Sequence, residues 1–183
     1  MDFYTLRLCG IERKLPLSFV SRNTRLASFT ILGDVELVDR LADTIADKLR
    51  TLPFDYLVGP EVKVVPLIHG VAKRLGHKRF ILCRKSVKPY MISPIILKPL
   101  PHFPKHIKQL VINGSDAELL RGKRVVVIDD VVSTGVTIRM IYKLMEKVGS
   151  SVVKTVVVLK QGNFTDSFSD LWYLGELPFF KSS

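Results

Sequence analysis

The sequence predicts an α/β domain in which helices cover both faces of a central, doubly wound parallel β-sheet. Two observations lead to this prediction. Short runs of β-branched and other apolar residues alternate with longer segments in which apolar residues recur every three or four positions. The clearest run, residues 125–128, is apolar at every position, which is typical of a parallel strand buried on both faces.

The first half of the chain contains two predicted helices and two predicted strands. Asp34 is the expected N-cap of the first helix, because apolar residues follow at helical spacing at Leu37, Leu41, Ile45 and Leu49. Residues 54–58 then form a short strand. A second helix begins near Val65 and ends at Gly76, and residues 80–83 form the next strand.

The second half supplies a βαβ unit. After the strand at residues 125–128, helical spacing returns at Ile138, Ile141, Leu144, Met145 and Val148. Gly149 ends this helix, and residues 152–159 form the last predicted parallel strand. The loop of residues 133–137 therefore lies between the carboxyl end of a strand and the amino end of a helix, where unpaired N–H groups and the helix dipole favour an anion.

Length and composition limit the classes of protein to consider. A chain of 183 residues with 47% hydrophobic residues is long enough for one domain with a buried sheet. No apolar run approaches the ~18 residues of a membrane span, the first residues lack the basic start of a secretion signal, and the two cysteines suit a reducing cytoplasm. The net charge of +11 favours polyanionic ligands, of which a pyrophosphate is one and a nucleic acid another.

Two adjacent acids stand at the lip of the predicted anion loop. Asp129 and Asp130 follow the apolar strand directly, and Ser133, Thr134 and Thr137 lie in the loop beyond them. Carboxylates beside a phosphate would repel it unless they face a neutral part of the ligand, and vicinal hydroxyls are the groups that carboxylates bind well. A sugar phosphate, with its ribose toward the acids, is therefore the expected ligand.

Other phosphate and metal motifs are absent from the sequence. It contains neither G-x-x-x-x-G-K-[ST] nor G-x-G-x-x-G, which excludes the common nucleotide triphosphatase loop and the dinucleotide fingerprint. Cys9 and Cys83 stand alone and the four histidines are scattered, so no group has the spacing of metal ligands. No protein-held metal is expected, and any Mg²⁺ would arrive with the substrate.

The strand, acid pair and loop resemble the 5-phosphoribosyl 1-pyrophosphate (PRPP) signature of the type I phosphoribosyltransferases. The resemblance implies that Asp129 and Asp130 hold the ribose hydroxyls. It also implies that the loop holds the 5′-phosphate through Val132, Ser133, Thr134, Gly135, Val136 and Thr137, although the family has a second glycine where this chain has Val136. The alternative is a doubly wound domain in which the acids only end a strand and a threonine caps a helix.

A turn after the second strand is similar to the family's pyrophosphate-binding turn. Glu61, Val62 and Lys63 occupy it, and the resemblance implies backbone contacts to pyrophosphate, often through a non-proline cis peptide. In a parallel sheet this turn should face the phosphate loop across the crevice at the strand ends. The alternative is that Glu61 and Lys63 are surface charges at the start of a helix.

A basic segment begins just after the strand at residues 80–83. Arg84, Lys85 and Lys88 lie in a stretch similar to one found in adenine- and xanthine-type purine phosphoribosyltransferases. The resemblance implies that these cations contact pyrophosphate, in their own site or in that of a partner subunit within a homodimer. A solvated basic face is the alternative.

A lid is expected over the crevice because an oxocarbenium-like centre must be kept from water. Residues 90–97 and 107–112 are predicted to be two exposed strands joined by a proline-rich turn, within a mobile loop of residues 86–118. The prolines could instead mark an edge that blocks aggregation.

The chemistry implied by the resemblance needs few protein groups. Mg²⁺ held mainly by the substrate would neutralise charge as the C1–O bond breaks. Lys85 and the Glu61 turn would stabilise the leaving pyrophosphate, and Asp130 or Glu61 is the expected proton acceptor.

The base-binding hood is assigned to residues 1–33, ahead of a core at residues 34–160 and a C-terminal segment at residues 161–183, all in one domain. The base contacts expected are Phe29, Ile31, Leu32, Val131 and Lys160. The hood residues are equally compatible with an ordinary core. Lys160 lies where 6-oxopurine enzymes place a lysine that recognises O6, but it is also compatible with a strand-end surface lysine.

Taken together, the resemblance implies a Mg²⁺-dependent purine salvage enzyme, a pentosyl transferase that forms AMP and pyrophosphate from adenine and PRPP. Transfer to hypoxanthine, guanine or xanthine is the first alternative. A PRPP-sensing transcriptional regulator is the second, although the chain has no room for a winged helix ahead of Asp34. Neither nucleic acid nor a membrane is an expected partner of the enzyme.

Overall fold

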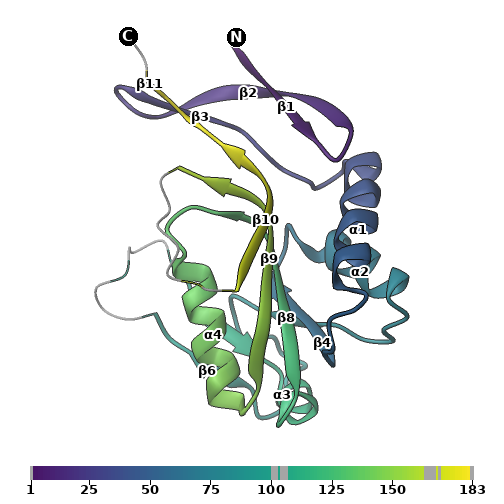
Figure 1. The fold of residues 1–183 in the computed structure, drawn as a ribbon. Helices are drawn as coiled ribbons and strands as arrows, with labels where there is room; N and C mark the ends of the chain where they lie inside the picture. Colours follow the sequence, from purple (N-terminus) through teal and green to yellow (C-terminus); the bar gives the residue numbers. More distant parts are fainter. Residues whose placement is uncertain (1, 100–102, 104–106, 163–167, 169, 182–183) are drawn as a thin grey trace.

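The computed structural model describes residues 2–99, 103, 107–162, 168 and 170–181, and it contains the predicted parallel sheet (Figure 1). The core sheet has five strands in the order β10-β9-β8-β4-β5, and each neighbouring pair is parallel. The strands are β4 (Tyr56–Pro60), β5 (Ile81–Cys83), β8 (Arg124–Val132), β9 (Ser151–Gln161) and β10 (Leu171–Leu177). The α/β prediction is confirmed.

Helices cover both faces of this sheet, as predicted. Helices α1 (Val35–Leu49) and α2 (Val65–Arg74) lie on one face, and α4 (Val136–Val148) and the short α3 (Gly114–Leu120) on the other (Figure 1). Alternate residues of β8 supply the two cores, because successive strand side chains point to opposite faces. Val126 and Ile128 pack with α1 and α2, and Val125 and Val127 pack with α4.

The helix boundaries follow the capping signals in the sequence. The Leu37 N–H donates to Asp34 Oδ1 at 3.1 Å, which makes Asp34 the N-cap of α1. Gly76 and Gly149 follow α2 and α4 with φ of 75° and 77°, the left-handed conformation in which glycine ends helices. None of the helices within the described residues is long and apolar enough to cross a membrane.

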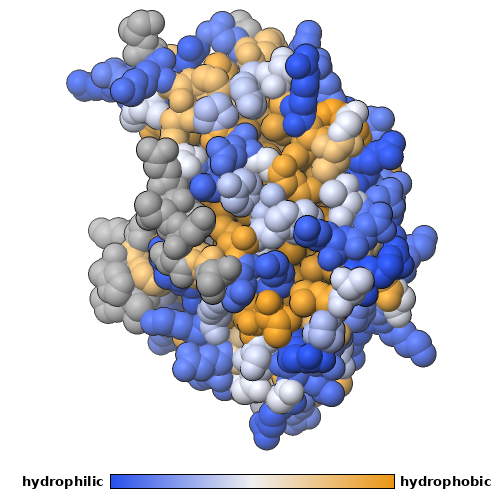
Figure 2. Space-filling model, viewed as in Figure 1, coloured by the Kyte–Doolittle hydropathy of each residue, from blue (hydrophilic) through white to orange (hydrophobic). Residues whose placement is uncertain are grey.

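The hood is a separate antiparallel sheet above the core (Figure 1). Strands β1 (Phe3–Leu8), β2 (Ile11–Ser21) and β3 (Thr24–Ala27) form it together with β11 (Phe179–Lys181), in the order β1-β2-β3-β11. Figure 2 shows hydrophobic surface between this sheet and α1. Leu32, in the connection from β3 to α1, and Val35, the first residue of α1, are 43% and 80% exposed.

The C-terminal segment differs from its expected place outside the core. β10 extends the core sheet beyond β9, so the parallel sheet does not end at residue 160, and Lys160 lies opposite Glu176 instead of closing the last strand. β11 then crosses into the hood. Sequence pattern missed β10 because it is an edge strand of half-buried residues, interrupted by Gly175 and Glu176.

The expected lid hairpin is shorter and more buried than predicted. β6 (Ile95–Leu97) pairs antiparallel with β7 (Leu110–Ile112), but all three residues of β7 are buried, so the prediction of two exposed strands is wrong for β7. It packs against β5 and is anchored by a bridge between Arg84 and Val111. The helix α3 also lies inside the expected loop of residues 86–118, and the central turn at residues 100–102 and 104–106 lies outside the described residues.

One guanidinium fastens the hood to the core. Arg13 of β2 donates to Asp34 through Nε at 2.7 Å and Nη2 at 3.0 Å, and Nη2 also donates to Glu36 at 2.7 Å. The Arg13 bond lowers the pKa of Asp34, although partial burial opposes this effect. The same carboxylate thus caps α1 and holds the hood.

We expect Arg13→Ala to lower the melting temperature more than Arg7→Ala, whose side chain pairs with Glu12 at an exposed site. Because folding lowers the pKa of Asp34, this stabilisation is present above its unfolded pKa and is lost as pH falls through the folded pKa. The difference between Arg13→Ala and the wild type should therefore shrink in strong acid. Thermal unfolding from pH 3 to pH 7 tests this, and equal effects of the two substitutions at neutral pH would contradict it.

Candidate active site

The three segments singled out from the sequence meet at one edge of the core sheet. β4, β8 and β5 end at Pro60, Val132 and Cys83, and each runs directly into one of these segments. Carboxyl ends of parallel strands share an edge, where such folds bind their ligands. The turn at residues 61–64, the loop at residues 133–137 and the segment from Arg84 therefore surround one crevice.

The loop at residues 133–137 has the form of an anion site. Gly135 is the N-cap of α4 with a φ of 69°, so the chain turns there in a conformation that favours glycine. Residues 131–138 and Asp129 line a small hollow of about 40 Å³ at this helix end. Val136, where the family has a second glycine, packs in the hydrophobic core, which accommodates its side chain.

The acid pair is buried beside this loop. Asp129 and Asp130 are 6% and 9% exposed, although both are still part of β8 instead of following it. Asp129 Oδ1 accepts from the Asp130 N–H at 2.9 Å, and Asp130 Oδ1 accepts from the Val131 N–H at 3.0 Å. Asp130 Oδ2 is buried and has no hydrogen-bond partner among the described residues.

Burial, the proximity of the two carboxyl groups and a nearby lysine together set the electrostatics of this pair. Burial raises the pKa of Asp129 well above its ordinary range, and the adjacent Asp130 carboxylate adds to the rise. The Lys63 ammonium is 3.7 Å from Asp130 Oδ2, near enough for an ion pair but too far for a hydrogen bond. Its side chain is 54% exposed and can move aside, so Asp130 can exchange this contact for a ligand hydroxyl.

The turn after β4 lies next to the acid pair, through the contact of Lys63 with Asp130. The Glu61–Val62 peptide is cis, which is the feature that the family resemblance implied for this turn. The Glu61 N–H donates to the Cys83 carbonyl at 3.0 Å and ties the turn to the end of β5. Lys63 of this turn approaches Asp130, so the turn meets the acid pair that borders the phosphate loop.

The Glu61 carboxylate organises the basic segment. One oxygen accepts from Arg84 Nη1 at 3.0 Å, and the other accepts from the Lys85 N–H at 2.8 Å. Burial alone would raise the pKa of Glu61, but the Lys85 N–H and the Arg84 guanidinium outweigh it and the pKa is lowered. A carboxylate that is ionised and engaged at both oxygens is a weak base, so this geometry favours a structural role for Glu61 over the expected proton acceptor.

The two lysines of the segment flank the same crevice. The Lys85 N–H is held by Glu61, and the charge of Lys85 opposes the rise in the pKa of Asp129. Lys88 Nζ donates to Ser86 Oγ at 2.9 Å, and its charge favours ionised Glu61. Together with Lys63 and Arg84, they form a cationic rim suited to a polyanion.

Of the residues expected to contact the base, some are buried in the core and others are accessible. Phe29 and Ile31 are 8% and 0% exposed and belong to the core, so their side chains are not available to a ligand in this conformation. Leu32 is exposed and Val131 is partly buried at the strand end. Lys160 Nζ lies 4.0 Å from Glu176 and 5.1 Å from the centre of the Tyr173 ring.

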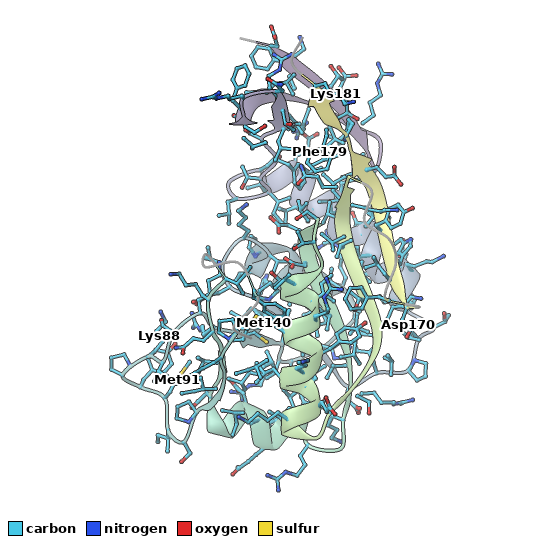
Figure 3. All side chains as sticks on the ribbon, turned by 90° about the vertical axis from the view of Figure 1, so that its left-hand side faces the viewer. Lys88, Met91, Met140, Asp170, Phe179 and Lys181 are labelled. Carbon is cyan, nitrogen blue, oxygen red and sulfur yellow. The ribbon has the colours of Figure 1, made fainter. Side chains whose placement is uncertain are left out.

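Sequence reasoning missed two aromatic contacts, one at the site and one between the hood and the end of β9. Tyr90 accepts a hydrogen bond from Arg84 Nη2 at 2.9 Å; it lies in the basic stretch, so proximity in sequence could have suggested it. Phe179, in the hood at the top of Figure 3, is 51% exposed and its ring lies over Gly162 at the end of β9. No local pattern relates residue 179 to residue 162, because only the sheet topology brings them together.

A doubly wound sheet with an anion loop, an acid pair and a cationic turn at one edge defines a class of α/β domains that bind phosphorylated ligands. The comparisons with known proteins specify the family. The phosphoribosyl transferase domain matches residues 31–173, and the chain belongs to this family. The match begins after the three N-terminal hood strands.

Individual relatives agree with this assignment. An adenine phosphoribosyltransferase of Lachnoclostridium phytofermentans is 30% identical over 131 residues, which are 72% of each chain. The HGPRTase-like protein 3 of Haloterrigena turkmenica is 30% identical over 129 residues, 70% of this chain and 64% of the relative. The crystal structure of adenine phosphoribosyltransferase from Thermoanaerobacter pseudethanolicus shares the fold, with a TM-score of 0.64 over 80% of this chain and 84% of its own, at 24% identity.

Proposed function

We propose that the protein transfers the 5-phosphoribosyl group from PRPP to adenine and releases AMP and pyrophosphate, a purine salvage reaction. The observation that carries this proposal is a buried Asp130 oxygen that has no hydrogen-bond partner in the described part of the chain and that lies beside an anion loop and a cationic turn. A buried acceptor left unsatisfied is costly, and a ribose hydroxyl would satisfy it. The adenine phosphoribosyltransferase relatives support the choice of reaction.

Each part of PRPP then has a matching surface. The 5′-phosphate binds the N–H groups of the loop at residues 133–137, at the amino end of α4. The ribose hydroxyls donate to Asp129 and Asp130. The pyrophosphate lies between the turn at residues 61–63 and the cations of the basic segment, which stabilise the charge that develops as the C1–O bond breaks.

The residues fit a Mg²⁺ that is carried by the substrate. Within the described part of the chain no group of three or more metal ligands occurs, whereas Mg²⁺ commonly uses one or two carboxylates together with phosphate oxygens and water. Asp129 and Asp130 are the carboxylates that would hold it. When bound, Mg²⁺ would supply neutralisation of the pyrophosphate charge.

In the reaction a nitrogen of the base attacks C1 of PRPP, and this nitrogen must lose its proton. Of the two acids expected to accept this proton, Asp130 is the better placed, because both oxygens of Glu61 are engaged by Arg84 and the Lys85 N–H. We further propose a homodimer, in which the exposed Lys85 serves its own site or that of the partner subunit.

A 6-oxopurine substrate is the second candidate, because Lys160 lies at the crevice edge opposite Val132 and the Haloterrigena relative is HGPRTase-like. The contacts of Lys160 with Glu176 and the Tyr173 ring favour adenine, since they occupy the ammonium that would have to meet O6.

The deciding experiment mixes the protein with Mg²⁺, PRPP and adenine, guanine, hypoxanthine or xanthine, and follows nucleotide and pyrophosphate by chromatography. We expect AMP from adenine, with little change in Lys160→Met. Turnover of an oxopurine that this substitution removes would establish the second candidate. No turnover of any base, together with salt-dependent binding of duplex DNA, would favour the regulator.

A further inference from the structure

The backbone of Arg84 is held in place by β7, whereas its side chain is positioned by separate contacts. Its N–H and carbonyl exchange two hydrogen bonds with Val111 of β7, each at 2.8 Å, so its Cα cannot shift without breaking this bridge. The position of the guanidinium is therefore decided by side-chain contacts alone. Two such contacts are present within the described residues, one to Glu61 and one to Tyr90.

These two contacts use different ends of the guanidinium. Nη1 donates to Glu61 at 3.0 Å, and Nη2 donates to the Tyr90 hydroxyl at 2.9 Å. Because the group is planar, acceptors at both ends fix the direction of its remaining N–H donors. Glu61 alone would leave the guanidinium free to rotate about one bond.

The segment between Arg84 and Tyr90 is closed into a compact loop. The Lys88 N–H donates to Met91 Sδ at 3.4 Å, the Met91 N–H donates to the Lys88 carbonyl at 3.0 Å, and the Ile92 N–H donates to Asn113 Oδ1 at 3.0 Å. Figure 3 shows Lys88 and Met91 side by side at one edge of the molecule. Tyr90 is thus held at the end of the loop that carries Lys85 and Lys88 of the cationic rim.

We propose that Tyr90 is a positioning residue for the pyrophosphate site, which acts by orienting the guanidinium of Arg84. This inference rests on the proposed function, since it assigns pyrophosphate to the cationic rim. The Tyr90 side chain is 62% exposed, so it contributes little to the hydrophobic core. Its hydroxyl instead prepares Arg84 for the anion before binding, which reduces the ordering that binding must supply.

The test is the affinity for inorganic pyrophosphate in the presence of Mg²⁺, measured by calorimetric titration of the full chain. Tyr90→Phe removes only the hydroxyl, and we expect a dissociation constant raised roughly twofold to tenfold, the usual worth of one hydrogen bond. The KM for PRPP should rise similarly and kcat should fall modestly, because Arg84 also stabilises the charge that develops on the leaving pyrophosphate, whereas the KM for the base should stay near wild type. The melting temperature should not fall.

Tyr142→Phe is the matched control. Its hydroxyl is 2.7 Å from Thr155 Oγ1 in a partly buried pair away from Arg84, so its loss should lower the melting temperature and leave pyrophosphate affinity unchanged. In an Arg84→Lys background, which keeps the charge but not the planar fork, Tyr90→Phe should have no further effect.

The outcomes are distinguishable. Wild type that binds pyrophosphate as tightly as Tyr90→Phe would overturn the role of Tyr90 and leave the proposed function standing. An undiminished effect of Tyr90→Phe in the Arg84→Lys background would overturn the route through Arg84. Wild type without any pyrophosphate affinity would overturn the proposed function and this inference together.

Discussion

Asp129→Asn is expected to raise the melting temperature of the unliganded protein at neutral pH and to lower its activity. Folding buries Asp129 next to Asp130 and raises its pKa, so the unfolded chain ionises it more easily than the native protein. Ionised Asp129 therefore opposes folding, by about 1.4 kcal/mol for each unit by which the pKa is raised. Asparagine has a similar shape and carries no charge.

The size of this effect on stability depends on pH in a defined way. Below the unfolded pKa of about 4 the carboxyl is protonated in both states and imposes no penalty. As pH rises from there toward the folded pKa, the wild type loses stability that the variant keeps. The melting temperature of Asp129→Asn should equal that of the wild type near pH 3 and exceed it at pH 7.5.

The activity of Asp129→Asn should fall, although its melting temperature should rise. Exchanging a carboxylate for an amide weakens its hydrogen bond to a ribose hydroxyl, and hydrogen bonds to charged groups contribute about 1.5–3 kcal/mol. We expect kcat/KM for PRPP to fall by at least about tenfold. Asp47→Asn, on the exposed surface of α1, is the control that should change neither quantity much. A destabilised Asp129→Asn, or one that turns over PRPP at the wild-type rate, would contradict this account.

Gly59→Ala is expected to destabilise the protein and to disturb the pyrophosphate turn. A Cβ at Gly59 in β4 would lie 2.6 Å from the Ile128 carbonyl oxygen of β8 and would also strike Ile68 of α2. Backbone cannot yield as a side chain can, so β4 would have to separate from β8. Overpacking of this kind costs about 1–3 kcal/mol, and sometimes more.

Gly59→Ala should also impair activity, because Gly59 lies close to the pyrophosphate turn in the chain. Gly59 is two residues before Glu61, so a displaced β4 also moves the turn that holds Arg84 and Lys63. Denaturant unfolding and turnover of PRPP should therefore both be impaired. Gly175→Ala is the matched control, because a Cβ there meets only the side-chain ends of Leu8 and Leu159, at 3.0 and 3.1 Å. Similar losses in the two variants would show that contact with backbone is not the cause.

Local pattern was sufficient where a signal and its effect lie close together in the chain. The cap at Asp34, the helix stop at Gly76 and the apolar run of β8 each depend on neighbours within a few residues. The acid pair and loop were found for the same reason, since strand, loop and helix follow one another directly. The parallel sheet then placed the turn at residues 61–63 and the segment from Arg84 at the same edge.

Pattern failed where burial or pairing depends on distant residues. The sequence of β10 does not show that it pairs with β9, nor does that of β7 show that it is buried against β5. Phe29 and Ile31 were expected at the base because they are apolar and lie in the hood, but the same property places them in the core.

The sequence by itself determined the fold class, the two helical faces and the segments that form the crevice, because these follow from periodicity and from the order of strands. Only the tertiary structure decided what each polar atom does. The sequence left Asp130 and Glu61 as alternative proton acceptors, whereas in the structure Arg84 and the Lys85 N–H occupy Glu61, and one buried oxygen of Asp130 has no hydrogen-bond partner among the described residues. Hydrogen bonding and burial act between residues far apart in the chain, so they are set only when the strands and loops come together.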